Sequence, residues 1–301
     1  MSIGELGLGR YPPLLVLNEN ASVLEVLAGM AEKRVRHCPL VSDEGVLVGM
    51  VSARDLVDFL GGQRYRSIVQ NRFKGDIYEA LTKVRASELS RYPAWVTEDT
   101  PLTDVLARFI ELGVGALVIV DRSKRVRGLL SERHMMSLFA NATTYVQVRE
   151  IMSRELVTAH PHEPISKALE LMSRHRVRRI PLQSGGKLSG IVTVKDVLGF
   201  LGSESSLKRL SAGEGESLLS TPLQSVASYP VLTVDAGEDV GKAVSIMKNH
   251  GVGCLVAVDG TGAPVGIVTE RDVVTRLPRV RGVELFTDLV KAAVFASRVS
   301  F

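Results

Sequence analysis

The sequence predicts an α/β (α+β) fold made of four β-α-β-β-α repeats that group into two pairs. A seven-residue pattern occurs four times: glycine, two apolar residues, serine or threonine, any residue, a base, and an acid. Around each copy, apolar residues alternate between strand-like runs and a helical spacing. The distances between copies run long, short, long. Such self-similarity indicates a repeat architecture in which each repeat is one supersecondary unit.

The four copies of the pattern differ at one end. Three finish with an acid, Asp55, Asp196 and Asp272, and the second finishes with His134. Each copy is followed by an apolar, helix-like run. The copies occupy residues 49–55, 128–134, 190–196 and 266–272.

The third repeat shows the unit most clearly. Pro164 suits the first position of a helix, and apolar residues then follow at i, i+3, i+4 and i+7, which is one helical face. That face comprises Ile165, Ala168, Leu169 and Met172. The predicted elements are strands at 156–158, 179–183 and 188–193, a turn at 184–186, and a second helix at 194–201.

The other repeats fit the same template. Their predicted strands are 14–17, 38–41 and 46–51 in the first repeat, 95–96, 116–120 and 126–130 in the second, and 231–234, 254–258 and 265–268 in the fourth. Their helix faces are Val23, Val26, Leu27 and Met30; Leu102, Val105, Leu106 and Phe109; and Val240, Ala243, Val244 and Met247.

Spacing defines the grouping. The pattern glycines at 49, 128, 190 and 266 are 79, 62 and 76 residues apart. We therefore predict a first pair at 1–146, with repeats at about 12–62 and 88–140, and a second pair at 147–278, with repeats at about 148–202 and 222–278.

Three segments lie outside the repeats. Polar stretches at 61–87 and 203–225 should connect the members of each pair, and the second, rich in Ser, Gly and Glu, should be partly mobile. The tail at 279–301 fits no repeat. A helix at 283–295, with Leu285, Leu289 and Ala292 on one face, would cap a sheet or mediate an interface.

Composition restricts the class of protein. The chain is 45% hydrophobic and 23% charged, which is typical of globular proteins. It has no apolar run of about 20 residues and no signal-peptide pattern, and two cysteines make no disulfide framework, so a reducing cytoplasm is expected. The net charge of +4 permits anionic ligands, while 5% aromatic residues offer no stacking platform for single strands.

Catalytic and metal motifs are not found. The sequence contains no G-x-x-x-x-G-K-[ST] loop, no G-x-S-x-G elbow and no H-E-x-x-H helix. His160 and His162 without nearby Cys or acidic partners are weak metal ligands. We therefore expect no enzyme, no metal site and no required cofactor.

The four units resemble cystathionine-β-synthase (CBS) domains, from about residue 12 to 278. The resemblance implies two Bateman modules, each a pair of repeats with buried sheets. It implies adenosyl ligands, such as AMP, ADP, ATP or S-adenosylmethionine, in clefts between paired repeats, and a sensor role toward a partner protein. Chains with four repeats and no catalytic domain resemble the γ subunit of AMP-activated kinase.

The pattern itself has two readings. Ser or Thr with Asp three residues later is a capping sequence, in which the hydroxyl can accept from the backbone N–H three residues on. The resemblance instead assigns Asp55, Asp196 and Asp272 to ribose hydroxyls. It places Ser52, Thr193 and Thr269 near phosphate and the bases Arg54, Lys195 and Arg271 in the same sites. His134 departs from this pattern.

Other family positions point mainly to the second pair. A threonine on the first strand matches Thr158 and Thr233, whereas Val16 and Trp95 stand there in the first two repeats. The pairs Arg36-His37 and Arg178-Arg179 are either a solvated patch or phosphate ligands, since arginine forks suit phosphate. The last set lies on equivalent strand positions and should pack against the adenine base or the core: Cys38, Ile180 and Cys254.

Two other functions remain open. A nucleic-acid-binding or scaffolding protein would use the basic surface, and its affinity would fall steeply with salt. An enzyme would need a nucleophile or metal set that the sequence does not show. Four repeats could close a disc within one chain, or two chains could pair as a homodimer.

Overall fold

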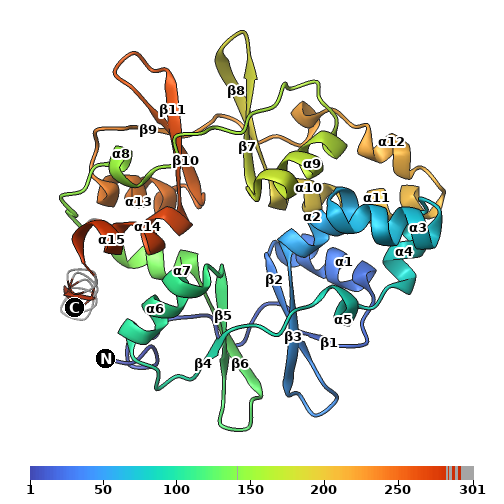
Figure 1. The fold of residues 1–301 in the computed structure, drawn as a ribbon, viewed down its shortest axis with the longest axis horizontal. Helices are drawn as coiled ribbons and strands as arrows, with labels where there is room; N and C mark the ends of the chain where they lie inside the picture. Colours follow the sequence, from blue (N-terminus) through green and yellow to red (C-terminus); the bar gives the residue numbers. More distant parts are fainter. Residues whose placement is uncertain (141, 283, 285–286, 289–290, 293–301) are drawn as a thin grey trace.

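The computed structural model describes residues 1–301 apart from 141, 283, 285–286, 289–290 and 293–301. It contains the four expected units (Figure 1). The first comprises β1 (Leu17–Asn18), α1 (Val23–Lys33), β2 (His37–Val41), β3 (Leu47–Ser52) and α2 (Ala53–Gly61); the second β4 (Trp95–Val96), α6 (Leu102–Leu112), β5 (Ala116–Val120), β6 (Val126–Ser131) and α7 (Glu132–Met136). The third comprises α9 (Ile165–His175), β7 (Arg179–Ser184), β8 (Lys187–Thr193) and α10 (Val194–Leu201); the fourth β9 (Thr233–Asp235), α13 (Val240–Asn249), β10 (Cys254–Val258), β11 (Pro264–Thr269) and α14 (Glu270–Thr275).

The first helix of every unit buries the face that the sequence predicts. In α9 the residues Ile165, Ala168, Leu169 and Met172 are all buried. Their spacing places them on one side of the helix, and removing that side from water is the main stabilising term. The predicted faces of α1, α6 and α13 are buried in the same way.

Sheet topology is the same in three units. The first strand pairs in parallel with the second, and the second pairs antiparallel with the third. In the third unit the strand predicted at 156–158 does not form, and the sheet has two strands. A single parallel bridge, Ala159 to Leu182, stands in its place. Pro161, two residues further on, has no N–H to extend the pairing toward the C-terminus.

The hairpin of the third unit is also tighter than predicted. Strand β7 continues through Ser184, so the turn is only Gly185-Gly186. Both residues have positive φ, +57° and +77°. A two-residue hairpin loop of this kind requires φ values that glycine adopts at little cost.

The pattern glycines explain how the units pair. One residue after each glycine, the strand bridges to the segment that leads into the partner unit. A Cβ on any of these glycines would lie under 3.0 Å from that segment. Glycine, which has no Cβ, therefore lets the two segments cross closely. The crossings are Gly49 over Ser90, Gly128 over Tyr11, Gly190 over Tyr229, and Gly266 over Ser153. The first unit therefore pairs with the second, and the third with the fourth.

The two pairs pack through their helices. One hydrophobic core joins α1 and α2 to α9 and α10, and a second joins α6 and α7 to α13 and α14. A smaller cluster of Leu47, Val118 and Val120 lies between the sheets of the first pair. Figure 1 shows the result: the sheets of the first pair lie at the bottom and those of the second at the top, and the helices of the two pairs meet on the left and on the right. The predicted α/β fold of paired repeats is confirmed.

Both connecting stretches contain short helices. The first contains η1 (Tyr65–Gln70), α3 (Asn71–Phe73), α4 (Ile77–Lys83) and α5 (Ala86–Leu89), and the second contains α11 (Glu204–Ser211), α12 (Gly215–Leu219) and η3 (Leu223–Ser225). The expected mobility of 203–225 is wrong, because Leu210, Leu218 and Leu223 are buried in the first core.

Short helices complete the described chain: η2 (Ser137–Phe139), α8 (Val148–Ile151) and α15 (Leu277–Arg281). The helix predicted at 283–295 falls largely outside the described residues. Across the described residues, every helix is too short or too polar to span a bilayer.

Candidate functional site

Each copy of the seven-residue pattern forms the start of a helix. In three units the carboxylate Oδ2 accepts hydrogen bonds from the backbone N–H and the hydroxyl of the Ser or Thr three residues earlier. The donor–acceptor distances are 2.8 and 2.6 Å at Asp55, 2.7 and 2.7 Å at Asp196, and 2.9 and 2.7 Å at Asp272. The pattern is therefore a helix cap in this chain, as the first reading predicts.

The direction of these bonds limits the hydroxyls. Ser52, Thr193 and Thr269 donate their single hydroxyl proton to the carboxylate. A hydroxyl has one proton, so it cannot donate to a phosphate at the same time. The backbone acceptance expected of the hydroxyl is seen at Thr269, where Asp272 N lies 3.4 Å from its oxygen.

The second carboxylate oxygen distinguishes the three acids. At Asp272, Oδ1 lies 3.3 Å from the guanidinium of Arg276. Among the described residues, Oδ1 of Asp55 and Oδ1 of Asp196 have no hydrogen bond or ion pair. The cap therefore uses one oxygen and leaves the other able to accept from a ligand hydroxyl.

His134 takes over the capping role in the second unit. Its Nδ1 accepts from Ser131 N at 3.1 Å and lies 3.2 Å from the Ser131 hydroxyl. Burial, with Arg10 and Arg133 nearby, lowers the pKa of this imidazole. The ring satisfies the cap with one nitrogen and supplies no second carboxylate oxygen.

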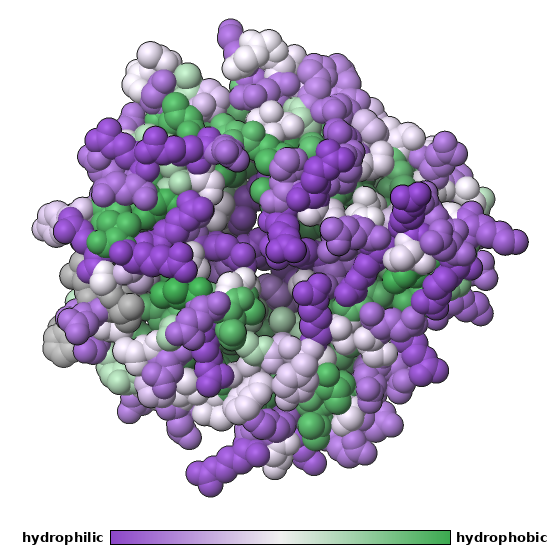
Figure 2. Space-filling model, in the orientation of Figure 1, coloured by the Kyte–Doolittle hydropathy of each residue, from purple (hydrophilic) through white to green (hydrophobic). Residues whose placement is uncertain are grey.

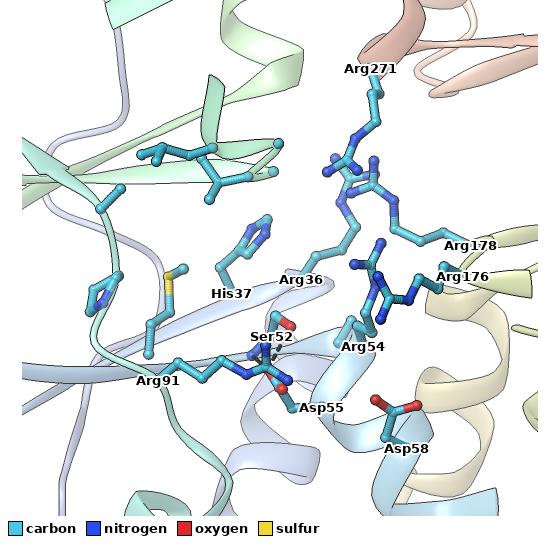
Figure 3. A pocket seen from close by; sticks show the side chains of 18 of the residues that line it. Arg36, His37, Ser52, Arg54, Asp55, Asp58, Arg91, Arg176, Arg178 and Arg271 are labelled. Atoms are coloured by element: carbon cyan, nitrogen blue, oxygen red, sulfur yellow. Dashed lines mark hydrogen bonds between the residues drawn. The ribbon is translucent and has the colours of Figure 1, made fainter. Parts of the chain in front are cut away.

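Each helix start opens into its own pocket, which we name by the final residue of the pattern. The Asp55 pocket has an apolar wall from the partner unit, including Pro93, Ala94 and Val114. Its opposite wall is basic and includes Arg178 and Arg271, which come from the other pair of units (Figure 3). The Asp196, His134 and Asp272 pockets repeat this arrangement. A molecule in any pocket would contact both pairs of units.

The basic walls are held by two buried glutamates. Glu132 and Glu270 have no exposed surface. Glu132 pairs with Arg178 and Arg271, both at 2.7 Å. Glu270 pairs with three arginines: Arg36 at 2.8 Å, Arg133 at 2.6 Å and Arg179 at 3.6 Å. These pairs join all four units at the middle of the molecule, where Figure 2 shows hydrophilic side chains around a hollow.

The arginine pairs are therefore not a solvated patch. Arg36, Arg178 and Arg179 are mostly buried, and their counter-charge is the two glutamates. The arginines lower the pKa of Glu270 to about 2, against the effect of burial. His37 is buried beside Arg36 and Arg178, and burial together with these cations lowers its pKa to about 3, so its imidazole is neutral.

Glycines in the even units make room for this cluster. A Cβ on Gly115 would lie 3.2 Å from His37 Nε2 and 3.3 Å from Arg178. A Cβ on Gly253 would lie 2.5 Å from Arg179 and 2.8 Å from Glu270. The alternation of basic residues and glycine along the sequence is thus one packing arrangement, in which odd units supply the bases and even units supply the space.

The two first-strand threonines do not line the pockets. Leu156 and Val157 border the Asp272 pocket, but Thr158 does not. Val231 and Leu232 border the Asp196 pocket, but Thr233 does not. The structure gives no support for favouring the second pair on these residues.

The residues at the three equivalent strand positions, Cys38, Ile180 and Cys254, lie in different surroundings. Cys38 and Ile180 are fully buried in the first core, and burial raises the pKa of the Cys38 thiol to about 12. Cys254 borders the Asp196 pocket, and burial raises its pKa as well. Neither thiol is suited to nucleophilic chemistry.

Several pocket residues were not predicted from the sequence. Glu132 and Glu270 occupy the position of the pattern that seemed to accept any residue, where the odd units have Ala53 and Val194. Arg34 and Arg176 line pockets as well. They lie three residues before His37 and Arg179, the basic residues that begin the second strands of their units. The signal was available as the alternation of Glu with a small or apolar residue. Within the described residues, no three His, Cys, Asp or Glu side chains form a metal cluster.

Comparisons with known proteins agree with the geometry. The CBS domain family matches residues 8–62, 86–141, 148–203 and 223–279. A Thermofilum pendens protein, "Uncharacterized 33.4 kDa protein in ribosomal RNA operon", is 50% identical over 301 residues, all of both chains. The crystal structure of protein MJ1225 from Methanocaldococcus jannaschii has a TM-score of 0.81 at 22% identity, covering 91% of this chain and 99% of that one.

In a further relative, the match covers only part of a longer chain. The γ-3 subunit of 5′-AMP-activated protein kinase from Sus scrofa is 28% identical over 130 residues, 43% of this chain and 24% of the subunit. The four matched segments coincide with the four units and their pockets, and with them more than half of the chain is covered. The chain belongs to the CBS domain family, with four CBS domains arranged as two Bateman modules.

Proposed function

We propose that this protein is a regulatory protein without catalytic activity that binds adenine nucleotides and passes their presence to a partner protein. The observation that carries the proposal is the unused Oδ1 of Asp55 and Asp196, each at a pocket with one apolar and one basic wall. An apolar slot suits a purine, a carboxylate oxygen accepts from ribose hydroxyls, and arginines attract phosphate.

The relatives support this proposal. The structure of MJ1225 is described as that of a proposed archaeal homologue of g-AMPK, and the Sus scrofa relative is a γ subunit of an AMP-activated kinase. Among adenosyl ligands, AMP, ADP and ATP are favoured because they carry phosphate toward the basic walls; S-adenosylmethionine remains a candidate for the same slot.

The geometry also supports a signalling role. Each pocket has walls from both modules, so a ligand that fits one relative arrangement better would shift the molecule toward it. A partner that contacts both modules could read that shift.

The test is calorimetric titration of the full chain with AMP, ATP and adenosine. Asp55→Ala and Asp196→Ala should each weaken all three ligands, because ribose is common to them. A lost hydrogen-bonding partner of this kind costs about 1–3 kcal/mol, or about one to two decades of affinity. Asp272→Ala should have the smallest effect, because Arg276 already occupies its Oδ1.

Melting curves for each variant separate binding from folding, since loss of a helix cap alone costs about 0.5–2 kcal/mol. If folded Asp55→Ala and Asp196→Ala variants bind like the wild type, the pattern is only a cap and the nucleotide assignment is wrong. Repeating the titration at higher salt separates a pocket from a nucleic-acid surface, whose affinity would fall much more steeply.

A further inference from the structure

The four pockets form two pairs, and the two pockets of each pair share four basic residues. Among the described residues, the Asp55 and Asp272 pockets have four lining residues in common, and all are arginines: Arg54, Arg176, Arg178 and Arg271. We call them the first quartet. In the described part of the chain, the His134 and Asp196 pockets also share four residues, again all bases: Arg34, Arg36, Arg133 and Lys195. They form the second quartet.

The quartets correspond to each other position by position. Arg54 and Lys195 are the bases of the first and third patterns, and Arg271 and Arg133 are those of the fourth and second. The remaining members come from the segment before the second strand of the first and third units. Each quartet thus combines residues from both modules, which places it between the two pockets.

Counter-charge within each quartet is incomplete. In the first, Glu132 pairs with Arg178 and Arg271. Arg54 and Arg176 have no ion pair or side-chain hydrogen bond among the described residues. Figure 3 shows these four guanidinium groups gathered on one side of the Asp55 pocket, with the carboxylate of Asp58 below them.

The second quartet has the same imbalance. Glu270 pairs with Arg36 and Arg133, while Lys195 and Arg34 have no such partner within the described part of the chain. Glu270 must also serve Arg179. Four bases around one buried carboxylate leave an excess of positive charge that attracts anions.

The electrostatics of the unpaired bases agree with this excess. Burial lowers the pKa of Arg54, and the neighbouring Arg271, Arg178 and Arg176 lower it further, while Asp58 raises it. Burial likewise lowers the pKa of Lys195 to about 8, with Arg36, Arg133 and Arg34 lowering and Glu270 raising it. A multiply charged anion between these side chains would relieve the repulsion among them.

Backbone conformation at two positions favours the same interpretation. Arg34 and Arg176 end helices α1 and α9 with φ of 52° and 55°. Glycine is the residue that adopts this conformation most readily, and Gly113 ends α6 in it, with φ of 58°. Arginine at both positions adds positive charge where glycine would be the less strained choice.

We propose that each quartet is a single polyphosphate-binding site that serves two pockets, so that each pocket pair accepts one phosphate chain at a time. This deepens the proposed function, on which it rests for the nucleoside end of the ligand. Two triphosphate chains in one pocket pair would compete for the same four bases. Arg36 and Arg178 also border a pocket of the opposite pair, but the remaining quartet members do not.

The first experiment uses inorganic tripolyphosphate, which needs no nucleoside pocket. Calorimetric titration of the full chain should give two tripolyphosphate ions per chain. Arg54→Gln should weaken one of them at least tenfold, and Lys195→Gln should weaken the other. Lys208→Gln is the charge-matched control, because Lys208 is exposed and its ion pair with Glu204 lies at the surface.

The second experiment compares ATP with adenosine. ATP should fill no more than two sites per chain, one for each quartet, and adenosine, which has no phosphate, should bind without using the quartets. Tripolyphosphate should displace ATP and leave adenosine bound. Arg54→Gln and Lys195→Gln should lower ATP affinity while adenosine binding stays as in the wild type.

The outcomes distinguish the two proposals. If tripolyphosphate binds as expected but neither ATP nor adenosine binds, the quartet sites stand and the nucleotide function is wrong. If ATP fills more than two sites per chain, or if the quartet variants bind tripolyphosphate like Lys208→Gln, the shared site is wrong and the nucleotide function stands. If no anion or nucleoside binds, both are wrong.

Discussion

The two pocket pairs are built alike and differ in chemistry. The first pair has an acid at both pattern ends, Asp55 and Asp272, and a quartet made only of arginines. The second pair has Asp196 and His134, and its quartet includes Lys195. Near the first quartet lies Asp58, three residues after Asp55, whereas Gly199 occupies the corresponding position after Asp196.

The buried glutamates differ as well. Glu132 holds two arginines, and Glu270 holds three. The comparison shows that one duplicated framework supports two sites of unequal character: the first with two acids and permanent charge, the second with one acid and a titratable base. The predictions below would break or sharpen this difference.

The largest effect should come from the glutamate with three partners. Glu270→Gln leaves buried arginines without counter-charge, which typically costs about 3–5 kcal/mol in the free energy of unfolding. Glu132→Gln should cost less, because only two arginines depend on it. Urea denaturation measures both, and Glu204→Gln, in an exposed pair, should cost under about 1 kcal/mol. Equal costs for the two buried glutamates would remove this distinction between the pairs.

Low pH should weaken the ion pairs between Glu270 and its arginines. The arginines hold the pKa of Glu270 at about 2, below its ordinary value of 4.5. The stabilisation is therefore fully present above about pH 4.5 and is lost as the pH falls toward 2, with a total of about 3 kcal/mol.

The measurement is the difference in unfolding free energy between wild type and Glu270→Gln. It should shrink by about 2 kcal/mol between pH 7 and pH 3. A constant difference over this range would show that the carboxylate is not stabilised by its arginines.

Changing His134 should make the second pair resemble the first. His134→Asp supplies a cap through one oxygen and a second oxygen for ribose, which should strengthen adenosine binding in that pocket by about one to two decades. His134→Asn is the matched control, since it lacks the carboxylate. If His134→Ala abolishes binding of the tightest nucleotide, the imidazole itself is a ligand residue and this assignment is wrong.

The smallest effect should be a pH dependence confined to the second quartet. With a pKa of about 8, Lys195 goes from about nine-tenths protonated at pH 7 to about one-tenth at pH 9. Tripolyphosphate affinity of the second quartet should fall by up to about tenfold over this range. The first quartet, made of arginines, has no group that titrates there.

Variants isolate the two responses. Arg54→Gln reports mainly the second quartet and Lys195→Gln mainly the first, so titration of tripolyphosphate itself cancels in the comparison. Lys195→Arg should remove the extra dependence. A pH response of the same size in both variants would contradict the assignment to Lys195.

Much of the fold could be predicted because it is encoded locally. The helix face of α6 follows from the spacing of Leu102, Val105, Leu106 and Phe109, and the caps follow from Ser or Thr with Asp three residues on. The strand expected at 156–158 did not form because sheet pairing depends on a distant partner, which local apolar character does not reveal.

The site was only half predictable for the same reason. The sequence by itself determined the four repeats, their grouping from the spacing of the pattern glycines, and the acids Asp55, Asp196 and Asp272. Only the tertiary structure decided what the bases do. Arg178 meets Glu132 across 46 residues and Arg36 meets Glu270 across 234. Periodicity and capping act within a few residues, whereas ion pairs depend on distances that exist only after both modules have packed, and no local pattern encodes those distances.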